Sequence, residues 1–174
     1  MSGALASPAT AELARRMIDC DVPAPAAADA QHTLALAWAL KEQCYAAWSS
    51  EPQRAAKAAD ALRSLCARGC GCGAPRQHAC EVEALADWTA GIAQVTRGQM
   101  SEATQSFDQA ADTFLRLEQP DHAAQTQVPK IMALAMLGQY DQAAECAEQA
   151  QREFVALGDA RGAGKVSLNL GALH

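Results

Sequence analysis

Apolar residues recur along the chain with the spacing of an amphipathic helix. Between residues 103 and 117 the apolar positions are Ala103, Phe107, Ala110, Phe114 and Leu117, at steps of four and three residues. The same steps return at Ala143, Ala147, Ala150, Phe154 and Leu157. This spacing puts the apolar side chains on one face of a helix, whereas a half-buried strand alternates apolar and polar positions. The pattern predicts an all-α protein.

The two stripes belong to a repeat with a period of 40 residues. Identical residues 40 positions apart are Gly98/Gly138, Gln99/Gln139, Ala103/Ala143, Ala110/Ala150, Phe114/Phe154 and Leu117/Leu157. Glycine ends the first helix of each unit, and we expect Ser101 and Asp141 to be the N-caps of the second helix. Residues 57–65 match residues 109–117 at an offset of 52, so a segment of twelve residues is inserted between the first two units. Each unit is predicted to be a helix, a tight turn and a second helix.

Glycine, proline and N-cap residues divide the chain into helices and predict their limits. The predicted helices span about residues 8–20, 27–47, 50–67, 76–97, 101–118, 121–137 and 141–157, and a last one runs from about 159 to the end. Residues 1–25 form an N-terminal helix with a Pro/Ala-rich linker, and residues 26–174 form one helical repeat domain. We expect the N-terminal helix to fold back on the repeats as a plug or a cap, through Leu13, Met17 and Ile18.

The composition narrows the classes of protein. Half of the 174 residues are hydrophobic but only 5% are aromatic, so alanine supplies much of the apolar surface, which favours closely spaced helices. The net charge is −6 and the basic residues are scattered, which argues against nucleic acid as a partner. No apolar run approaches the ~20 residues of a membrane span, and the first residues lack the order of a secretory signal. We therefore expect a cytoplasmic protein with no membrane partner.

Small and aromatic residues mark equivalent places in successive units. They are Gly91, Gly98, Ala103, Phe107 and Ala110 in one unit, Gly138, Tyr140, Ala143 and Ala150 in the next, and Leu170 and Gly171 in the last helix. This pattern resembles the tetratricopeptide repeat (TPR), which implies a right-handed α-α superhelix, or solenoid, of about three and a half helical hairpins. The 40-residue period is similar to that of the longer repeats found N-terminal to bacterial CHAT-type domains. Since a lone final helix leaves its leucines partly uncovered, we expect the repeat domain to be truncated at His174.

In TPR proteins the first helices line the concave wall of the superhelix, and the resemblance therefore implies a binding groove. At the 40- and 52-residue offsets, two apolar columns run along the first helices, formed by Leu36, Leu40, Trp88, Ile92, Val128, Met132 and Leu168. Such columns fit a peptide or a helix segment laid into the groove, and they equally fit an ordinary core between helices. Lys165 and Asn169, one helical turn apart, offer a polar clamp for a carboxylate. The interpretation is a non-enzymatic scaffold for protein–protein interaction, and an exposed final half-repeat also allows self-association.

Residues 66–80 form a cysteine-rich connection between two units. The candidate metal ligands there are Cys66, Cys70, Cys72, His78 and Cys80. Thiolate and imidazole are the usual donors to structural zinc, but this spacing lacks the paired CxxC knuckles of common zinc sites. Zinc, a disulfide and free thiols therefore remain open, with free thiols favoured in a chain without an export signal. We expect Cys20, Cys44 and Cys146 to be small buried hydrophobic residues.

The sequence contains no catalytic arrangement. The four histidines lie far apart, and the Gly-rich stretch GCGCG follows a helix, whereas a phosphate-binding loop follows a strand. We therefore predict no enzymatic activity and no required cofactor. Two alternative functions remain: a metal- or redox-sensing module built on residues 66–80, and the N-terminal regulatory region of a caspase-like (CHAT-type) peptidase.

Overall fold

The structure is a computed structural model that describes residues 7–25, 29–69 and 76–171. In these residues the chain forms helices joined by short turns and contains no strand. The helices are α1 (Pro8–Asp19), α2 (Ala30–Ala47), α3 (Pro52–Gly69), α4 (Arg76–Thr96), α5 (Met100–Arg116), α6 (Pro120–Met136), α7 (Tyr140–Ala156) and α8 (Ala160–Gly171). The prediction of an all-α protein is confirmed. Within the described ranges, none of the helices is long and apolar enough to cross a lipid bilayer.

Every predicted helix is present, and each begins within three residues of its predicted start. α1 begins at Pro8, where the fixed φ of proline suits the first helical position. The Ser7 hydroxyl accepts a hydrogen bond from the Thr10 amide at 3.2 Å and caps this helix. α6 begins at Pro120 and runs on through Pro129, as the sequence predicts.

The predicted N-caps of α5 and α7 are wrong. Both helices begin one residue before the predicted caps, at Met100 and Tyr140, so Ser101 and Asp141 already lie inside the first turn. The residues that precede the two helices are glutamines, and their side chains make no capping hydrogen bond. The preceding glycine turns, described next, set these starts through the backbone.

The turns after α4, α5, α6 and α7 share one backbone geometry. Their residues with positive φ follow one another at intervals of 20 positions: Gly98 (78°), Glu118 (59°), Gly138 (73°) and Gly158 (70°). In each turn the amide of the following residue donates to the carbonyl five residues back, at 2.9 to 3.0 Å, which is the closing bond of a Schellman motif. Since α5, α6 and α7 each contain 17 residues, one helix and its turn make a step of 20. The 40-residue sequence repeat is two such steps.

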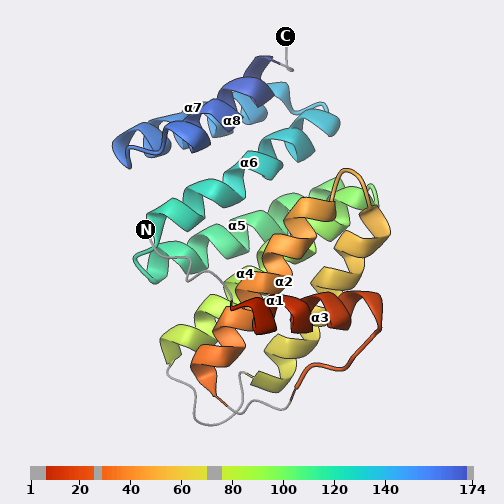
Figure 1. Ribbon diagram of the computed structural model, residues 1–174. Helices are drawn as coiled ribbons and strands as arrows, with labels where there is room; N and C mark the ends of the chain where they lie inside the picture. Colours follow the sequence, from red (N-terminus) through yellow and green to blue (C-terminus); the bar gives the residue numbers. More distant parts are fainter. Residues whose placement is uncertain (1–6, 26–28, 70–75, 172–174) are drawn as a thin grey trace.

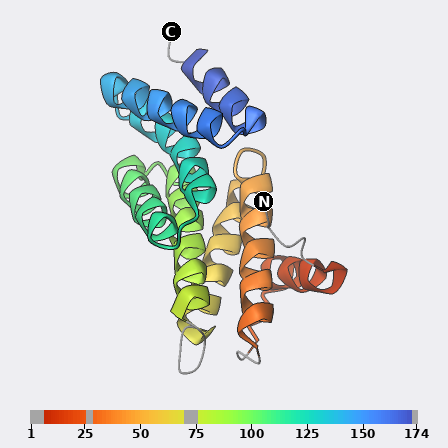
Figure 2. The ribbon, with the colours of Figure 1, turned by 90° about the vertical axis from the view of Figure 1, so that its left-hand side faces the viewer.

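The helices follow one another through the molecule. Each helix packs against the next one in the chain, and α2 contacts α4, α4 contacts α6, and α6 contacts α8. Figure 1 shows this order, from the N-terminal helices to α7 and α8 at the opposite end. The view in Figure 2 shows the C-terminal end of α2 directed toward α7 and α8. The even-numbered helices α2 to α8 therefore share one side of the molecule, here called the even-helix side.

α1 covers the first hairpin. Its buried Ala14, Met17 and Ile18 pack on α2 and α3, which are the helices that α1 contacts in the described chain. Arg54 of α3 donates to the Asp19 carboxylate at 2.8 Å. Among the described helices, α1 contacts α2 and α3 and does not reach α4, α6 or α8, so it covers the first hairpin, and its role as a plug or a cap stays a prediction.

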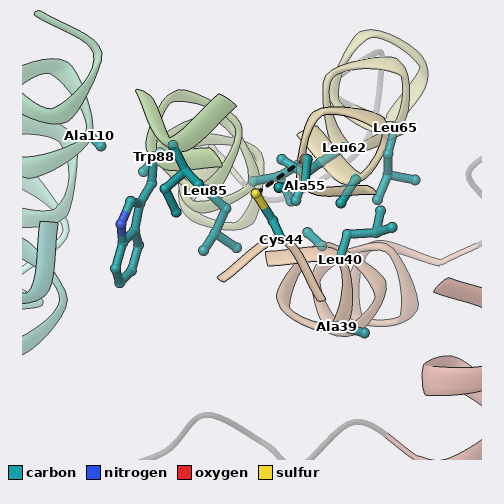
Figure 3. Close-up of a cluster of buried hydrophobic side chains, with 14 of the residues drawn as sticks. Ala39, Leu40, Cys44, Ala55, Leu62, Leu65, Leu85, Trp88 and Ala110 are labelled. Atoms are coloured by element: carbon teal, nitrogen blue, oxygen red, sulfur yellow. Dashed lines mark hydrogen bonds between the residues drawn. The ribbon is translucent and has the colours of Figure 1, made fainter. Parts of the chain in front are cut away.

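Leucine and small residues build the core of the N-terminal hairpins. Figure 3 shows Leu40 and Cys44 of α2, Leu62 and Leu65 of α3, and Leu85 and Trp88 of α4 gathered in one cluster. All of these side chains are at most 1% exposed. Cys44 Sγ donates to the Ala55 carbonyl at 3.4 Å, which satisfies the thiol inside the core. Because full burial of one leucine contributes about 1.5–3 kcal/mol, this cluster fixes how α2, α3 and α4 pack.

Candidate functional site

A cavity of about 370 Å³ lies on the even-helix side. Its lining residues are Lys41, Glu42 and Tyr45 of α2, Trp88 of α4, Gln125 and Val128 of α6, Phe154 of α7, and Asp159, Arg161, Gly162 and Lys165 at the start of α8. The first hairpin and the last helix thus contribute to one site. The lining combines aromatic rings with charged side chains.

The α2 wall of the cavity holds a buried lysine. Steps of three and four residues place Trp38, Lys41 and Tyr45 on one face of α2. Lys41 is 5% exposed, although lysine is rarely buried without a partner. Its Nζ lies 4.1 Å from the ring centroid of Trp88, 5.1 Å from that of Tyr45 and 5.6 Å from that of Trp38. Glu42 accepts a hydrogen bond from the same Nζ at 3.0 Å.

The surroundings of Lys41 act on its charge in opposite directions. Burial lowers the pKa of Lys41, the Glu42 carboxylate raises it, and the nearby Lys165 lowers it. The three ring faces favour the charged form as well, because the quadrupole of an aromatic ring attracts a cation. With a carboxylate and three rings around the ammonium, we assign Lys41 a positive charge in the cavity.

The α8 wall is positioned by the turn that precedes it. After Gly158, the Asp159 carboxylate accepts hydrogen bonds from the amides of Arg161 at 3.1 Å and Gly162 at 2.9 Å and so caps α8. α8 then lies so close to α7 that a Cβ on Gly162 would come within 2.3 Å of the Phe154 ring. This close approach sets Arg161 and Lys165, one helical turn apart, along the rim of the cavity.

Lys165 joins the two walls. Its Nζ lies 5.4 Å from the ring centroid of Tyr45, so a side chain of α8 reaches across to α2. Burial raises the pKa of Tyr45, and the phenol therefore stays neutral at physiological pH. The contact spans the even-helix side from the first hairpin to the last helix and closes the cavity on that side.

The cavity has an excess of positive charge. Three basic side chains line it, Lys41, Arg161 and Lys165, against two acidic ones, Glu42 and Asp159. Both carboxylates are engaged, Glu42 with Lys41 and Asp159 with the α8 amides. The chain as a whole carries a net charge of −6, so this concentration of basic groups is local. The cavity therefore favours an anion.

A second polar cluster adjoins the cavity at Trp38. The buried Glu81 of α4 accepts hydrogen bonds from Trp38 Nε1 at 2.9 Å and from Gln119 Nε2 at 3.2 Å. The His122 ring lies 4.6 Å from that of Trp38 and 5.4 Å from that of Phe114, measured between centroids. Burial lowers the pKa of His122, although Asp121 and Glu81 oppose the shift. This cluster ties α6 to α2 and α4.

The residues predicted to line a groove divide between the cavity and the core. Trp88, Val128 and Lys165 line the cavity. Leu36, Leu40 and Ile92 are fully buried, which agrees with the alternative of an ordinary core between helices and not with a groove. The neighbouring positions on α2 and α4 are largely alanines, which let these two helices approach closely and enclose the larger side chains between them.

The remaining predicted groove residues lie elsewhere. Met132 is half-buried and packs against the core of the N-terminal helices. Leu168 of α8 is 77% exposed and belongs to neither the core nor the lining of the cavity. The side chain of Asn169 lies outside the described residues, so the predicted clamp keeps only Lys165.

The cysteine-rich segment is described in part. Cys66 lies near the end of α3, and His78 and Cys80 lie at the start of α4, all three partly buried. Cys70 and Cys72 fall outside the described residues. Among the residues that the structure does describe, no group of three or more His, Cys, Asp or Glu side chains is arranged to hold a metal ion. Zinc at this segment stays a prediction, which the zinc content of the purified protein tests.

The cysteines outside that segment differ in burial. Cys44 is fully buried, and burial raises the pKa of its thiol to about 12. Cys146 is partly buried, and burial raises its pKa to about 11. Since the thiolate is the reactive form, both are unreactive at neutral pH. The prediction is wrong for Cys20, which is exposed directly after α1.

Eight of the eleven lining residues were not predicted from the sequence, among them Lys41, Tyr45 and Arg161. For α2 the sequence held a signal, because Trp38, Lys41 and Tyr45 place a lysine inside an aromatic stripe at helical spacing. Nothing in the sequence placed Arg161 beside α2, since that proximity depends on how all the helices between them pack.

In comparisons with known proteins, no family model, curated protein or solved structure matches the chain.

Proposed function

We propose that this chain is a non-enzymatic interaction scaffold, a TPR-like right-handed superhelix of helical hairpins that binds a protein or peptide segment through its concave face. The repeated turn geometry supports the superhelix. Equal turns at Gly98, Glu118, Gly138 and Gly158 impose nearly the same rotation between successive helices. The order of contacts between the even-numbered helices agrees with a concave wall built by the first helix of each hairpin.

The observation that carries the proposal is the cavity between α2 and α8. Binding sites are concave, with aromatic and apolar walls and a few converging polar groups, and this cavity has both kinds of lining. Leu36, Leu40 and Ile92 of the predicted columns are buried between helices and hold the scaffold rigid. The partner therefore docks at the cavity, with a side chain inserted between Tyr45, Arg161 and Lys165.

Selection from a displayed library of random peptides against the whole chain tests this proposal. We expect the selected peptides to share an acidic residue and to bind the wild-type chain with micromolar affinity. The double variant Arg161→Glu, Lys165→Glu reverses the charge on the α8 rim and is expected to lose binding at least tenfold, because like charges at an interface are strongly unfavourable.

A matched control is available on the neighbouring helix. Arg152 of α7 is 71% exposed and pairs with Glu148, away from the cavity lining. Arg152→Glu alters the net charge in the same direction and is expected to leave peptide binding unchanged. The proposal fails if no peptide is selected, or if selected peptides bind the double variant and the wild type equally well, with helicity verified by circular dichroism.

Self-association through the C-terminal half-repeat is a second mode of interaction that one observation favours. Leu168 of α8 is 77% exposed, and in the described chain α8 packs only on α6 and α7, which leaves this side chain accessible to a second copy. Leu168→Glu is expected to shift the chain toward monomer in light scattering at high protein concentration. An unchanged mass for the variant would contradict this mode.

A further inference from the structure

We propose that the cavity between α2 and α8 is a site for a small organic monocarboxylate with a compact apolar body. This inference rests on the proposed function only in taking the cavity as the place where a ligand binds. It names the chemistry of that ligand and holds whether or not a peptide also docks on the same face.

The charges of the lining select a single negative charge. Lys41, Arg161 and Lys165 contribute three positive charges, and Glu42 and Asp159 contribute two negative ones, so one monoanion makes the lining neutral. A dianion would leave the site with a net negative charge. An amine would add a fourth positive charge beside Lys41.

The two lysines gain from an anion placed near both of them. Both ammonium groups lie near the Tyr45 ring, Lys41 Nζ at 5.1 Å and Lys165 Nζ at 5.4 Å from its centroid, so two like charges stand close together. Ring faces hold each ammonium in place, with Lys41 over Trp88 and Lys165 over Tyr45. A carboxylate that accepts hydrogen bonds from these lysines replaces repulsion with attraction, and neither lysine has to be newly ordered.

The size of the cavity sets the size of the ligand. About 370 Å³ is at the lower end of the volumes, roughly 300–1,000 Å³, that ligand pockets occupy. A bound α-helix has a diameter of about 10–12 Å and does not fit a space that Lys165 already bridges to Tyr45. The site therefore admits a small molecule with an apolar body about the size of one aromatic ring.

The part of the lining away from the charges is apolar. Val128 and the Phe154 ring face the cavity together with Trp88 and Tyr45. The amide of Gln125 lies in the same lining and offers both a donor and an acceptor. Val128 and Phe154 are already at most 7% exposed, so the apolar surface removed from water on binding is mainly that of the ligand body, which contributes about 25 cal/mol per Å².

Calorimetric titration of the whole chain with three matched compounds tests the inference. The probes are 3-phenylpropionate, 3-phenylpropanamide and 3-phenylpropylamine, which share one apolar body and differ in charge. We expect saturable one-to-one binding of the carboxylate, at least tenfold weaker binding of the amide, and no binding of the amine. Acetate, which lacks the body, is expected to bind at least tenfold more weakly than the phenyl carboxylate.

Substitutions on α8 connect the binding to the cavity. Arg161→Gln and Lys165→Gln each remove one positive charge from an exposed position and are each expected to weaken the carboxylate about tenfold. Neither change is expected to alter binding of the amide. Arg152→Gln on α7 is the charge-matched control and is expected to leave all affinities unchanged.

Three results would overturn the inference: equal affinity for the carboxylate and the amide, tighter binding of the amine, or no saturable binding of the carboxylate. Failure of the proposed function is distinguishable. If peptides are selected and depend on Arg161 and Lys165 while the carboxylate does not bind, the scaffold stands and the inference is wrong. If the carboxylate binds and no peptide is selected, the inference stands and the scaffold is wrong.

Discussion

The helices before and after the α5–α6 turn have the same backbone repeat but differ in what they bury. Helices α1 to α5, with Ala123 and Ala133 of α6, share one large buried cluster. Its large side chains include Ile18, Leu62, Leu85, Trp88 and Phe107. Helices α6 to α8 enclose a smaller cluster in which four of nine buried residues are alanine, with Ile131 and Phe154 as its largest fully buried side chains.

The surface shows the same contrast. Apart from Leu115 on α5, the large apolar residues exposed in the described chain all lie from α6 onward: Met136, Leu137, Tyr140, Val155, Leu157 and Leu168. Identical turns therefore do not give identical stability, because stability depends on the apolar area that the helices bury. We expect α7 and α8 to open at lower free energy than α2 to α5. Since α8 supplies Arg161 and Lys165, it is the cavity wall most able to move.

The largest expected difference concerns two buried aromatic residues, one in each region. Phe107 on α5 and Phe154 on α7 are both at most 1% exposed. Phe107→Ala is expected to lower the free energy of unfolding by about 3–5 kcal/mol, because the surrounding cluster is held on several sides and cannot collapse into the space. Phe154→Ala is expected to cost at least 1 kcal/mol less, because α8 can settle toward α7. Urea unfolding followed by circular dichroism measures both, and equal losses would contradict the contrast.

Two glycines allow the opposite test, by adding atoms. A Cβ on Gly91 would lie 2.5 Å from the Phe107 ring, and a Cβ on Gly162 would lie 2.3 Å from the Phe154 ring. Gly91→Ala is expected to destabilise the protein by about 1–3 kcal/mol, because α4 is packed against α2, α3 and α5 and cannot shift. Gly162→Ala is expected to cost less and to displace α8, which weakens ligand binding in the cavity. A larger loss of stability for Gly162→Ala would reverse the ranking of the two regions.

Two helix caps provide a smaller and more local test. Asp29 accepts a hydrogen bond from the Gln31 amide at 3.2 Å at the start of α2, and Asp159 caps α8 in the same way. Each change to alanine is expected to cost about 1 kcal/mol. Hydrogen exchange is expected to show faster exchange confined to α8 for Asp159→Ala. For Asp29→Ala, exchange is expected to accelerate throughout the N-terminal cluster, and a response limited to α2 would contradict the cooperative packing of that region.

The smallest expected effect lies where the two regions meet, at His122. Its pKa is lowered in the folded state, so the unfolded chain binds the proton more readily and stability falls as pH drops through about 6.5 and below. The charged groups that act on His122 are Asp121, Glu81 and Lys41. His122→Gln is expected to reduce the loss of stability between pH 7.5 and pH 5, as thermal melts at the two pH values measure. An identical pH dependence of stability in the variant and the wild type would show that His122 does not contribute to it.

The helices were predictable from the sequence because their signals are local. Steps of three and four residues define each apolar face, and Gly98 and Gly138 end helices through a conformation that glycine adopts readily. The turn at Glu118 was harder to predict, because its positive φ is held by a residue with no preference for it. Only the structure shows that this turn equals the glycine turns and that the repeat has a step of 20 residues.

The candidate site was less predictable because it depends on packing between distant segments. The predicted columns include two residues that line the cavity, Trp88 on α4 and Val128 on α6, and the predicted polar clamp includes a third, Lys165 on α8. Whether a side chain on that face is exposed depends on how closely neighbouring helices approach, which is why Leu36 and Ile92 proved to be core residues. Periodicity within one helix contains no information about that distance.

The uniform turns have a consequence for how such a chain can change length. The helix pair between Gly98 and Gly138 is bounded at both ends by the same turn with the same backbone hydrogen bonds. A copy of those forty residues can therefore be inserted or removed at these turns without a change in how the neighbouring helices end. Such a change moves α8 relative to α2 and separates Lys165 from Tyr45. The number of units therefore decides whether α2 and α8 lie close enough to form the cavity. Adding one unit is expected to replace the cavity with an open surface.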